Sequence, residues 1–527
     1  MDASYLSHCP AASHWQKIGV KTHHGINVPL FSLHSSQSKG IGEFSDLLLL
    51  IDWCNSIGFD VIQLLPLNDT GINTSPYSAL SAFALNPIYI SLSTLPHITE
   101  YTFLVEELKI LPQFVYSERI EYQKVFENKE RFLRQYYEIV GSKILSSEDY
   151  RKFTESAKAW LKEYAVFKVL KKKNEGKNWE QWPEEERFPT PFFIEQIASQ
   201  EQEEINWYCV QQYLCDLQMR HAKDYAFEKE VFLKGDIPIL IDRDSADVWC
   251  HQELFDLNFS AGAPPDMYSQ EGQNWGFPTY DWNAAENQNY NWWINRLKWS
   301  SRYYHIYRID HIVGFFRIWS IPIGSKSSEG KFIPEDENTW VDHGQKIMVM
   351  MLEASDMLPI GEDLGVVPPI VRTCLSALGI CGTRVMRWER KWEEDSQFIL
   401  PQNYLIDSMT TVSTHDSETL PQWWQQYPED AQLFAQFKGW TYQPILSREH
   451  HREMLWDSHH TNSLFHINLL LEYLSLVPGL NWGNPENERI NTPGTISENN
   501  WTYRMKPSLE DLIQHSTLHN LMKELII

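Results

Sequence analysis

Short apolar runs that end in polar residues recur along the chain and alternate with segments of helical spacing. The runs 26–33 (INVPLFSL) and 59–67 (FDVIQLLPL) enclose a helical pattern, and strand, helix, strand is the repeating unit of a parallel sheet. An eighth strand is expected between about 460 and 490, near LLEYLSLVPGLNW. Five further runs complete the series, at 236–242, 304–310, 358–363, 383–388 and 410–416. This alternation predicts an α/β fold, a (β/α)8 TIM barrel, whose chemistry lies at the carboxyl ends of its strands.

Between residues 100 and 230 the pattern changes to long charged stretches with helical spacing, such as ERFLRQYYEIV and WLKEYAVFKVLKKK. We interpret residues 100–230 as a largely helical insertion in a single catalytic barrel that spans residues 1–527. No series of alternating short strands follows the last expected strand. A C-terminal β-sandwich domain is therefore not expected.

The composition fits a large globular protein rather than a binding tail or a fibre. The 527 residues are 43% hydrophobic, and 45 basic against 70 acidic residues give a net charge of −25. Nucleic acid binding depends on cationic contacts to phosphate, so we expect no nucleic acid partner. Aromatic residues make up 13% of the chain, and their rings suit either core packing or contact with sugars. No obligatory protein partner is evident from the sequence.

The cysteines and the N-terminus indicate a reducing compartment. The seven cysteines are scattered and contain no CxxC pair, which argues against a disulfide framework or a zinc ribbon. The N-terminal MDASYLSHCPAASHW lacks the charged start and the apolar core of a secretory signal. No apolar stretch approaches the roughly 20 residues that cross a bilayer. We therefore expect a cytoplasmic protein with no membrane association.

Acidic residues stand at the ends of three expected strands, in the segments RIDH, EDLG and THDS. These segments place Asp310, Glu362 and Asp416 at the catalytic rim of the barrel. One such acid alone would be weak support, because most acids are merely solvated. Three acids in barrel order, with Arg308 two residues before Asp310, indicate an active site.

Cleavage of a glycosidic bond needs two carboxyls in opposite states, one ionised and one protonated. Because residues i and i+2 of a strand point to the same side, Arg308 is expected beside Asp310, where it keeps that carboxyl anionic as a nucleophile requires. Glu362 is expected to lack such a cation and to lie near other carboxylates, which favours its protonated form and the role of acid and base. A retaining pair of this kind is expected to hold its carboxyls about 5 to 5.5 Å apart.

These motifs resemble those of a known family. RIDH, EDLG and THDS, with GDIPILIDRDSADVWCHQELFDL, AGAPPDMYSQEGQNWGFPTYDW and ENERINTPGTISENNWTYR, are similar to segments of the 4-α-glucanotransferases called amylomaltases or disproportionating enzymes. These form family 77 of the glycoside hydrolases, in the α-amylase clan. The resemblance runs from about residue 17 to 505 and implies transfer of an α-1,4-glucan segment to the 4-hydroxyl of an acceptor glucan or glucose. It also implies a retaining double displacement through a covalent glucosyl-enzyme.

The resemblance implies roles for individual residues. Asp310 would be the nucleophile, Glu362 the acid and base, and Asp416 the carboxylate that grips the sugar hydroxyls. The segment 261–282 would be a loop that covers the active site. The implied substrate-binding residues are Ser75, Tyr77, Asp266, Gln273, Trp275, Arg308, His311 and His415. The partners would be α-1,4-glucans and maltooligosaccharides, and the chemistry requires no metal and no organic cofactor.

Three positions depart from the family pattern. Ile72 stands where many bacterial members carry a tyrosine of an accessory glucan site, so the sequence leaves that accessory site open. GFP replaces the usual GNP after Trp275, and Ser417 replaces the asparagine of a THDN motif. All three carboxylates are kept, so the chemistry is expected to survive.

Two other functions stay open at this point. An α-amylase-type hydrolase would use the same three carboxylates with water as the acceptor, and the match of segment 261–282 to the transferases argues against it. A non-catalytic glucan-binding protein would not need the three acids together with Arg308. Maltotriose distinguishes the three functions, because transfer yields longer oligosaccharides, hydrolysis yields only shorter ones, and binding yields neither.

Two weaker motifs are interpreted without catalytic roles. GIGEFS at 40–45 lacks the third glycine of a dinucleotide-binding loop and indicates a turn. Adjacent residues do not share a helix face, and no HExxH motif is present. A surface helix rather than a metal site is therefore expected for His450, His451, His459 and His460.

Overall fold

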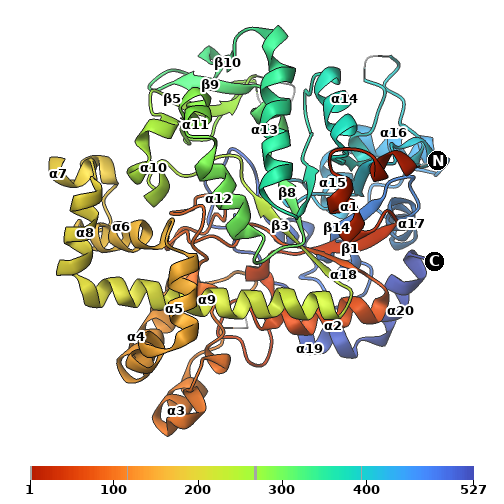
Figure 1. Ribbon diagram of the computed structural model, residues 1–527. Helices are drawn as coiled ribbons and strands as arrows, with labels where there is room; N and C mark the ends of the chain where they lie inside the picture. The colour runs from red at the N-terminus through yellow and green to blue at the C-terminus, as the bar shows by residue number, and fades with distance from the viewer. Residues whose placement is uncertain (1–2, 115–116, 266–269, 393) are drawn as a thin grey trace.

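A sheet of eight parallel strands forms the centre of the structure (Figure 1). The computed structural model describes residues 3–114, 117–265, 270–392 and 394–527. The strands follow one another around the sheet in chain order. They are β1 (His23–Asn27), β2 (Val61–Gln63), β3 (Phe232–Ile237), β8 (Ile306–Ile309), β11 (Leu358–Gly361), β12 (Gly382–Val385), β13 (Ser408–Thr411) and β14 (Phe465–Leu469).

The sheet closes into a barrel between β11 and β12. Ile360 and Cys381 form a parallel bridge, and the backbone N–H of Gly361 donates to the carbonyl of Cys381 at 2.7 Å. The pairings along the rest of the sheet are parallel as well. The predicted (β/α)8 TIM barrel is therefore confirmed.

The first, the third and the eighth strand differ from the sequence expectation. β3 ends at Ile237, so only the first two residues of the expected run 236–242 are in the strand. β1 begins three residues before the apolar run 26–33, and Leu30–Ser32 within that run forms a 3₁₀ helix. β14 lies in the expected range but precedes LLEYLSLVPGLNW, which begins with the helix α18 (Leu470–Leu474). A short apolar run does not distinguish a buried strand from a buried helix, so the pattern gives the right range but places the strand a few residues too late.

Helices cover the outside of the barrel. In α2 (Asp46–Ile57) one face is buried, and the helix ends at Gly58, whose φ of +86° is a left-handed conformation that glycine adopts without strain. α1 (Ala12–Ile18) precedes β1. The helices between the barrel strands from β3 to β14 include α12 (Asn291–Ser300), α13 (Trp340–Ala354), α14 (Pro369–Leu378), α15 (Leu420–Gln426), α16 (Pro428–Lys438) and α17 (Arg448–His459). After α18 follow α19 (Leu509–Gln514) and α20 (Ser516–Leu525), and no strand is described beyond β14.

The connection from β2 to β3 is helical, and its helices gather on one side of the barrel in Figure 1. The last of them, α9 (Gln202–Glu228), leads directly into β3 and packs on both α2 and β3, as a crossover helix of the barrel does. The others are α3 (Thr102–Ile110), α4 (Tyr122–Ser146), α5 (Glu148–Ser156), α6 (Leu161–Lys173), α7 (Glu184–Arg187) and α8 (Pro191–Gln200). The division of the chain at residues 100 and 230 stays a prediction.

A small antiparallel sheet, which the sequence pattern did not predict, is built from the segments that follow β3 and β8. Its order is β10 (Lys331–Ile333), β9 (Ile318–Pro322), β5 (Phe259–Ala263) and β6 (Gln273–Asn274). The strands β4 (Phe255–Asp256) and β7 (Thr279–Tyr280) pair beside it, and α10 (Ala246–Cys250) and α11 (Trp282–Asn287) complete these connections. Strands of two to five residues carry too little periodicity to be recognised from sequence.

Two global properties bear on the expected compartment. All seven cysteines are free thiols. Within the described ranges, no helix combines the length and the apolar character that crossing a bilayer demands.

Candidate active site

Three acidic residues come together at the carboxyl ends of neighbouring strands. Asp310 directly follows β8, Glu362 directly follows β11, and Asp236 is the fifth residue of β3. β8 lies between β3 and β11 in the sheet, and Asp236 is the register partner of Arg308. Parallel strands end at the same edge, so these side chains converge there.

Arg308 is at the centre of this cluster, with 8% of its side chain exposed. Its Nη1 lies 2.9 Å from both carboxylate oxygens of Asp236 and 2.8 Å from Oδ1 of Asp310. Its Nη2 lies 3.7 Å from Oε2 of Glu362. The expected pair between Arg308 and Asp310 is present, whereas the expectation that Glu362 lacks a neighbouring cation is wrong. Glu362 is on the strand next to β8, and sequence spacing within one strand does not reveal contacts between strands.

Burial of Glu362 nevertheless raises the pKa of its carboxyl to about 8. The negative charge of Asp310 adds to this effect, while Arg308 and two backbone N–H groups oppose it. These N–H groups belong to His311, which donates to Oε2 at 2.9 Å, and Leu364, which donates to Oε1 at 3.1 Å. Glu362 therefore holds a proton near neutral pH although a guanidinium is nearby, because desolvation penalises its charged form most.

His311 connects the carboxylates to the small antiparallel sheet. Its φ of +43° is left-handed, an uncommon conformation for a residue with a side chain, and it directs the His311 N–H toward Glu362. Burial lowers the pKa of the imidazole to about 4, so the ring is neutral at pH 7. The ring of Trp275 meets it edge-on, with centroids 5.0 Å apart. Trp275 in turn donates from Nε1 to Oε1 of Gln273 at 3.1 Å, while Asp266 lies outside the described residues.

Asp416 reaches the site from a loop rather than from a strand end. β13 stops at Thr411, so the prediction that residues 410–416 form a strand is wrong for residues 412–416. His415 Nε2 lies 3.1 Å from Oδ2 of Asp416, and Asn491 donates to Oδ1 at 2.7 Å. Burial alone would raise the pKa of Asp416, but His415 and Asn491 outweigh it and lower that pKa to about 2. Asp416 is therefore ionised across the physiological range.

Tyr77 connects Asp236, which pairs with Arg308, to His415, which lies beside Asp416. Its hydroxyl donates to Oδ2 of Asp236 at 2.9 Å and lies 2.8 Å from Nε2 of His415. Because the hydroxyl proton is used toward Asp236, the oxygen accepts from His415, which therefore carries a proton on Nε2. Ser75 is half-buried in the same loop, and its backbone N–H donates to Asn73. Among the described residues, Ser75 makes no hydrogen bond to the carboxylates.

The C-terminal segment 487–504 closes one side of the site. Asn491 contacts Asp416, and the ring of Trp501 packs against both Tyr77 and His415, with centroids 5.5 and 5.9 Å apart. Arg119 holds this segment by donating to the carbonyls of residues 487, 489 and 499. Sequence reasoning missed Asp236, Asn491 and Trp501 as site residues. All three lie in segments that match the family, but nothing in the sequence relates them to the three acids.

Comparisons with known proteins show the family to which the chain belongs. The family model described as 4-alpha-glucanotransferase matches residues 28–510. The chain belongs to the 4-alpha-glucanotransferase family. The 4-alpha-glucanotransferase of Chlamydia pneumoniae is 44% identical over 527 residues, covering 99% of this chain and 98% of the relative. That of Thermus thermophilus is 31% identical, covering 84% of this chain and 87% of the relative.

Solved structures show the same fold. The amylomaltase of Streptococcus agalactiae superposes with a TM-score of 0.82 at 24% identity, over 96% of this chain and 98% of that one. The amylomaltase of Corynebacterium glutamicum gives a TM-score of 0.79 at 20% identity, over 98% of this chain and 76% of that one. As a member of the 4-alpha-glucanotransferase family, the chain transfers glucan segments, and the hydrolase alternative gains no support.

The segment with His450, His451, His459 and His460 differs in part from the surface helix that the sequence predicts. It forms the helix α17, and the ring of His450 stacks on Trp440 with centroids 4.1 Å apart. His451 and His459, however, are buried, so the interpretation as a surface helix is wrong for these two residues. Within the described part of the chain, no group of three or more His, Cys, Asp or Glu side chains is arranged to hold a metal ion.

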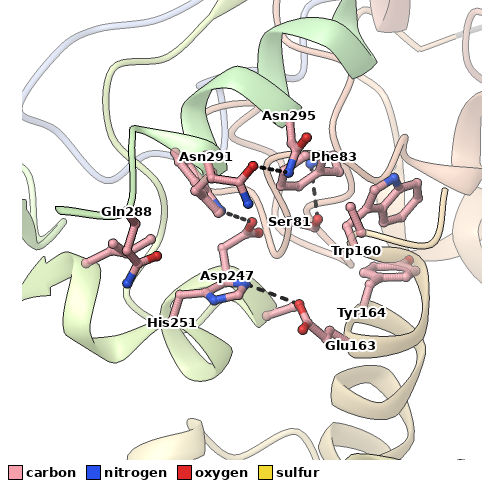
Figure 2. A pocket seen from close by; sticks show the side chains of 14 residues that line it. Ser81, Phe83, Trp160, Glu163, Tyr164, Asp247, His251, Gln288, Asn291 and Asn295 are labelled. Carbon is pink, nitrogen blue, oxygen red and sulfur yellow. Dashed lines mark hydrogen bonds and ion pairs between the residues drawn. The ribbon is translucent and has the colours of Figure 1, made fainter. Parts of the chain in front are cut away.

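A second cavity lies outside this site, between α6, α10 and α12 (Figure 2). Its volume is about 70 Å³. That is about half of the ~150 Å³ that encloses benzene in an engineered protein cavity, so a sugar ring would not be enclosed. The polar contacts around it connect helices, since His251 pairs with Glu163 at 3.2 Å and Trp292 donates to Asp247 at 2.9 Å. This cavity is a packing feature of the glucanotransferase rather than its active site.

Proposed function

We propose that Asp310 is the nucleophile and Glu362 the general acid and base of a retaining glucan transfer. One observation carries the proposal: two neighbouring carboxyls lie beside the same guanidinium, Asp310 in an ion pair of 2.8 Å and Glu362 at 3.7 Å, and burial raises the pKa of Glu362. A retaining pair needs this division between an ionised and a protonated carboxyl. The ion pair of 2.8 Å between Arg308 and Asp310 supports the anionic partner.

In the first step Asp310 attacks the anomeric carbon of an α-1,4-glucan, and a bond forms between them. The glycosidic bond breaks, and its oxygen takes the proton of Glu362. The carboxylate left on Glu362 keeps the N–H groups of His311 and Leu364 as donors, which stabilise its charge.

In the second step the Glu362 carboxylate takes the proton of the 4-hydroxyl of an acceptor glucan or of glucose. The hydroxyl oxygen then attacks the anomeric carbon and displaces Asp310. The two inversions restore the α configuration, so the product is again an α-1,4-glucan. Both side chains return to their starting states, and no cofactor enters the scheme.

Asp416 is proposed to bind hydroxyls of the sugar that is transferred. It is ionised, and 40% of its side chain is exposed, which leaves acceptor positions for sugar hydroxyls beside His415 and Asn491. Tyr77, His415 and His311 line the same region. Gln273, Trp275 and Asp266 belong to the segment 261–282, which we propose covers the active site; it is not a continuous loop, because it contains β6 and β7. We further propose that Ser75 contacts glucan and that Arg308 sets the charge state of the pair.

We propose maltooligosaccharides and longer α-1,4-glucans as the substrates. The amylomaltase of Streptococcus agalactiae was solved in complex with acarbose, and we expect this chain to bind acarbose in the same cluster. The free cysteines are consistent with a cytoplasmic enzyme.

Product analysis with maltotriose tests the proposal. The wild-type chain is expected to yield glucose and a ladder of longer oligosaccharides. Folded Asp310→Asn and Glu362→Gln variants are each expected to lose more than about 90% of kcat, a change above roughly 1.4 kcal/mol. A variant that kept more activity would contradict its assigned role, and shorter sugars alone would indicate hydrolysis.

A further inference from the structure

A buried contact between a carboxyl and an imidazole lies behind the active site and has no role in the chemistry described so far. Glu472 in α18 and His451 in α17 approach to 3.1 Å between Oε2 and Nε2. Glu472 is 0% exposed and His451 is 3% exposed. A buried carboxylate pays a desolvation cost and persists only where partners satisfy its oxygens, so its other contacts indicate what it does.

The second oxygen of Glu472 holds the loop that carries Asp416. Oε1 accepts from the hydroxyl of Ser413 at 2.5 Å and from the backbone N–H of Leu420 at 2.9 Å. These two donors lie on either side of His415 and Asp416 in the chain. One carboxylate therefore fixes both ends of the segment 413–420, which we call the Asp416 loop.

The Asp416 loop needs such support because no strand fixes it. β13 ends at Thr411, five residues before Asp416, and Asn468 of β14 binds the N–H of Val412 at 2.9 Å. Beyond Val412, hydrogen bonds inside the loop are short-range, such as the N–H of Thr414 donating to the Ser417 hydroxyl at 2.9 Å. In the middle of the loop, Glu418 also pairs with Arg387 at 3.2 Å and with Arg489 at 2.8 Å. Glu472 supplies the contact that ties both loop ends to the barrel.

We propose that Glu472, itself held by His451, is a positioning residue for Asp416. Its carboxylate sets the distance between the two ends of the Asp416 loop, and this places Asp416 and His415 against the sugar. The inference rests on the role proposed above for Asp416. Misplacement of a reacting or binding group by about 1 Å can lower a rate by a factor of roughly 100, so the effect should be visible in kcat.

The test compares variants in the full chain with maltotriose as substrate. Glu472→Ala is expected to lower kcat by roughly 100-fold, and Glu472→Gln by less than about 10-fold, because the amide oxygen still accepts from both loop ends. Ser413→Ala removes one loop contact, leaves the contact between Glu472 and His451 intact and is expected to lower kcat by about 5-fold. The matched control is His450→Gln, one residue before His451 and without contact to the loop, with kcat expected within about 2-fold of wild type.

A double-mutant cycle with Asp416→Asn separates positioning from a general effect on folding. If Glu472 acts through Asp416, then Glu472→Ala added to Asp416→Asn lowers kcat by less than about 3-fold further. An equal loss in both backgrounds would overturn the proposal. If Glu472→Ala does not fold, the same cycle is run with Ser413→Ala, and unchanged kcat in folded Ser413→Ala would also overturn it. Near wild-type kcat in Asp416→Asn would instead refute the role of Asp416 itself.

Discussion

The Arg308 guanidinium donates from Nη1 to both carboxylate oxygens of Asp236 at 2.9 Å. Asp236 is 2% exposed and also accepts from the Tyr77 hydroxyl. Asp236 thereby fixes the direction of the guanidinium that pairs with Asp310. Asp236, which makes no bond in the proposed mechanism, is thus placed to influence the charge states of Asp310 and Glu362.

Asp236→Asn is expected to lower kcat by about 100-fold in a folded protein. The amide offers one acceptor in place of two and no negative charge, so Arg308 shifts toward Glu362 and lowers the pKa of that carboxyl. Steady-state kinetics with maltotriose measures the change, and Glu253→Gln at an exposed position serves as the control. Activity within about 3-fold of wild type would show that Arg308 does not depend on Asp236.

The rate is expected to fall as pH rises through about 8, the pKa of Glu362. Glu362 must be protonated to act as the acid, and its proton is present below this pH and lost above it. The pKa of Asp416 is lowered to about 2, so Asp416 stays ionised over the same range. A profile of kcat/KM between pH 5 and 10 measures the alkaline limb. A rate that stayed constant up to pH 10 would contradict the assignment.

Trp275→Ala is expected to lower transfer more than hydrolysis. The Trp275 ring contacts His311 beside Glu362, and a loop there excludes water from the glucosyl-enzyme while an acceptor sugar binds. Free glucose and total reducing ends, measured separately with maltotriose, give the ratio of the two reactions. Trp456→Phe, on α17 and outside the segment 261–282, is a suitable control. An unchanged ratio in folded Trp275→Ala would leave the ring a packing role only.

Stability is expected to fall as pH drops from about 6.5 toward 4, because of histidines at the opposite end of the barrel. His24 and His466 are register partners at the starts of β1 and β14, and His459 lies 3.0 Å from His24. Burial lowers the pKa of His24 to about 4 and that of His466 to about 3. These folded-state values lie below the unfolded value of about 6.5, so the stabilisation is complete above pH 6.5 and is lost below it.

For His24 alone the loss is on the order of 3 kcal/mol. Urea unfolding at pH 7.5, 6 and 4.5 measures it. His466→Gln should flatten the pH dependence in this range, whereas His450→Gln at the outer face of α17 should leave it unchanged. If His466→Gln kept the wild-type dependence of stability on pH, as His450→Gln is expected to do, the buried histidines would not be the source of that dependence.

Much of this protein could be predicted from local patterns. Apolar runs of strand length that alternate with helical spacing led to the barrel, because each strand buries both faces and each helix buries one. The acids after those runs lie at one edge for the same reason, as Asp310 and Glu362 do. Arg308 beside Asp310 follows from the two-residue period of a strand.

Contacts between distant segments could not be predicted in this way. The pairing of Arg308 with Asp236 depends on which strands are neighbours, and the raised pKa of Glu362 depends on burial by the whole barrel. Asp416 is held by Asn491 and, through its loop, by Glu472, which follow it by more than fifty residues. Charge states and loop positions are set by groups brought together in space, and a linear pattern records only spacing along the chain. The tertiary structure alone therefore decides which acid keeps its proton and which histidines are buried.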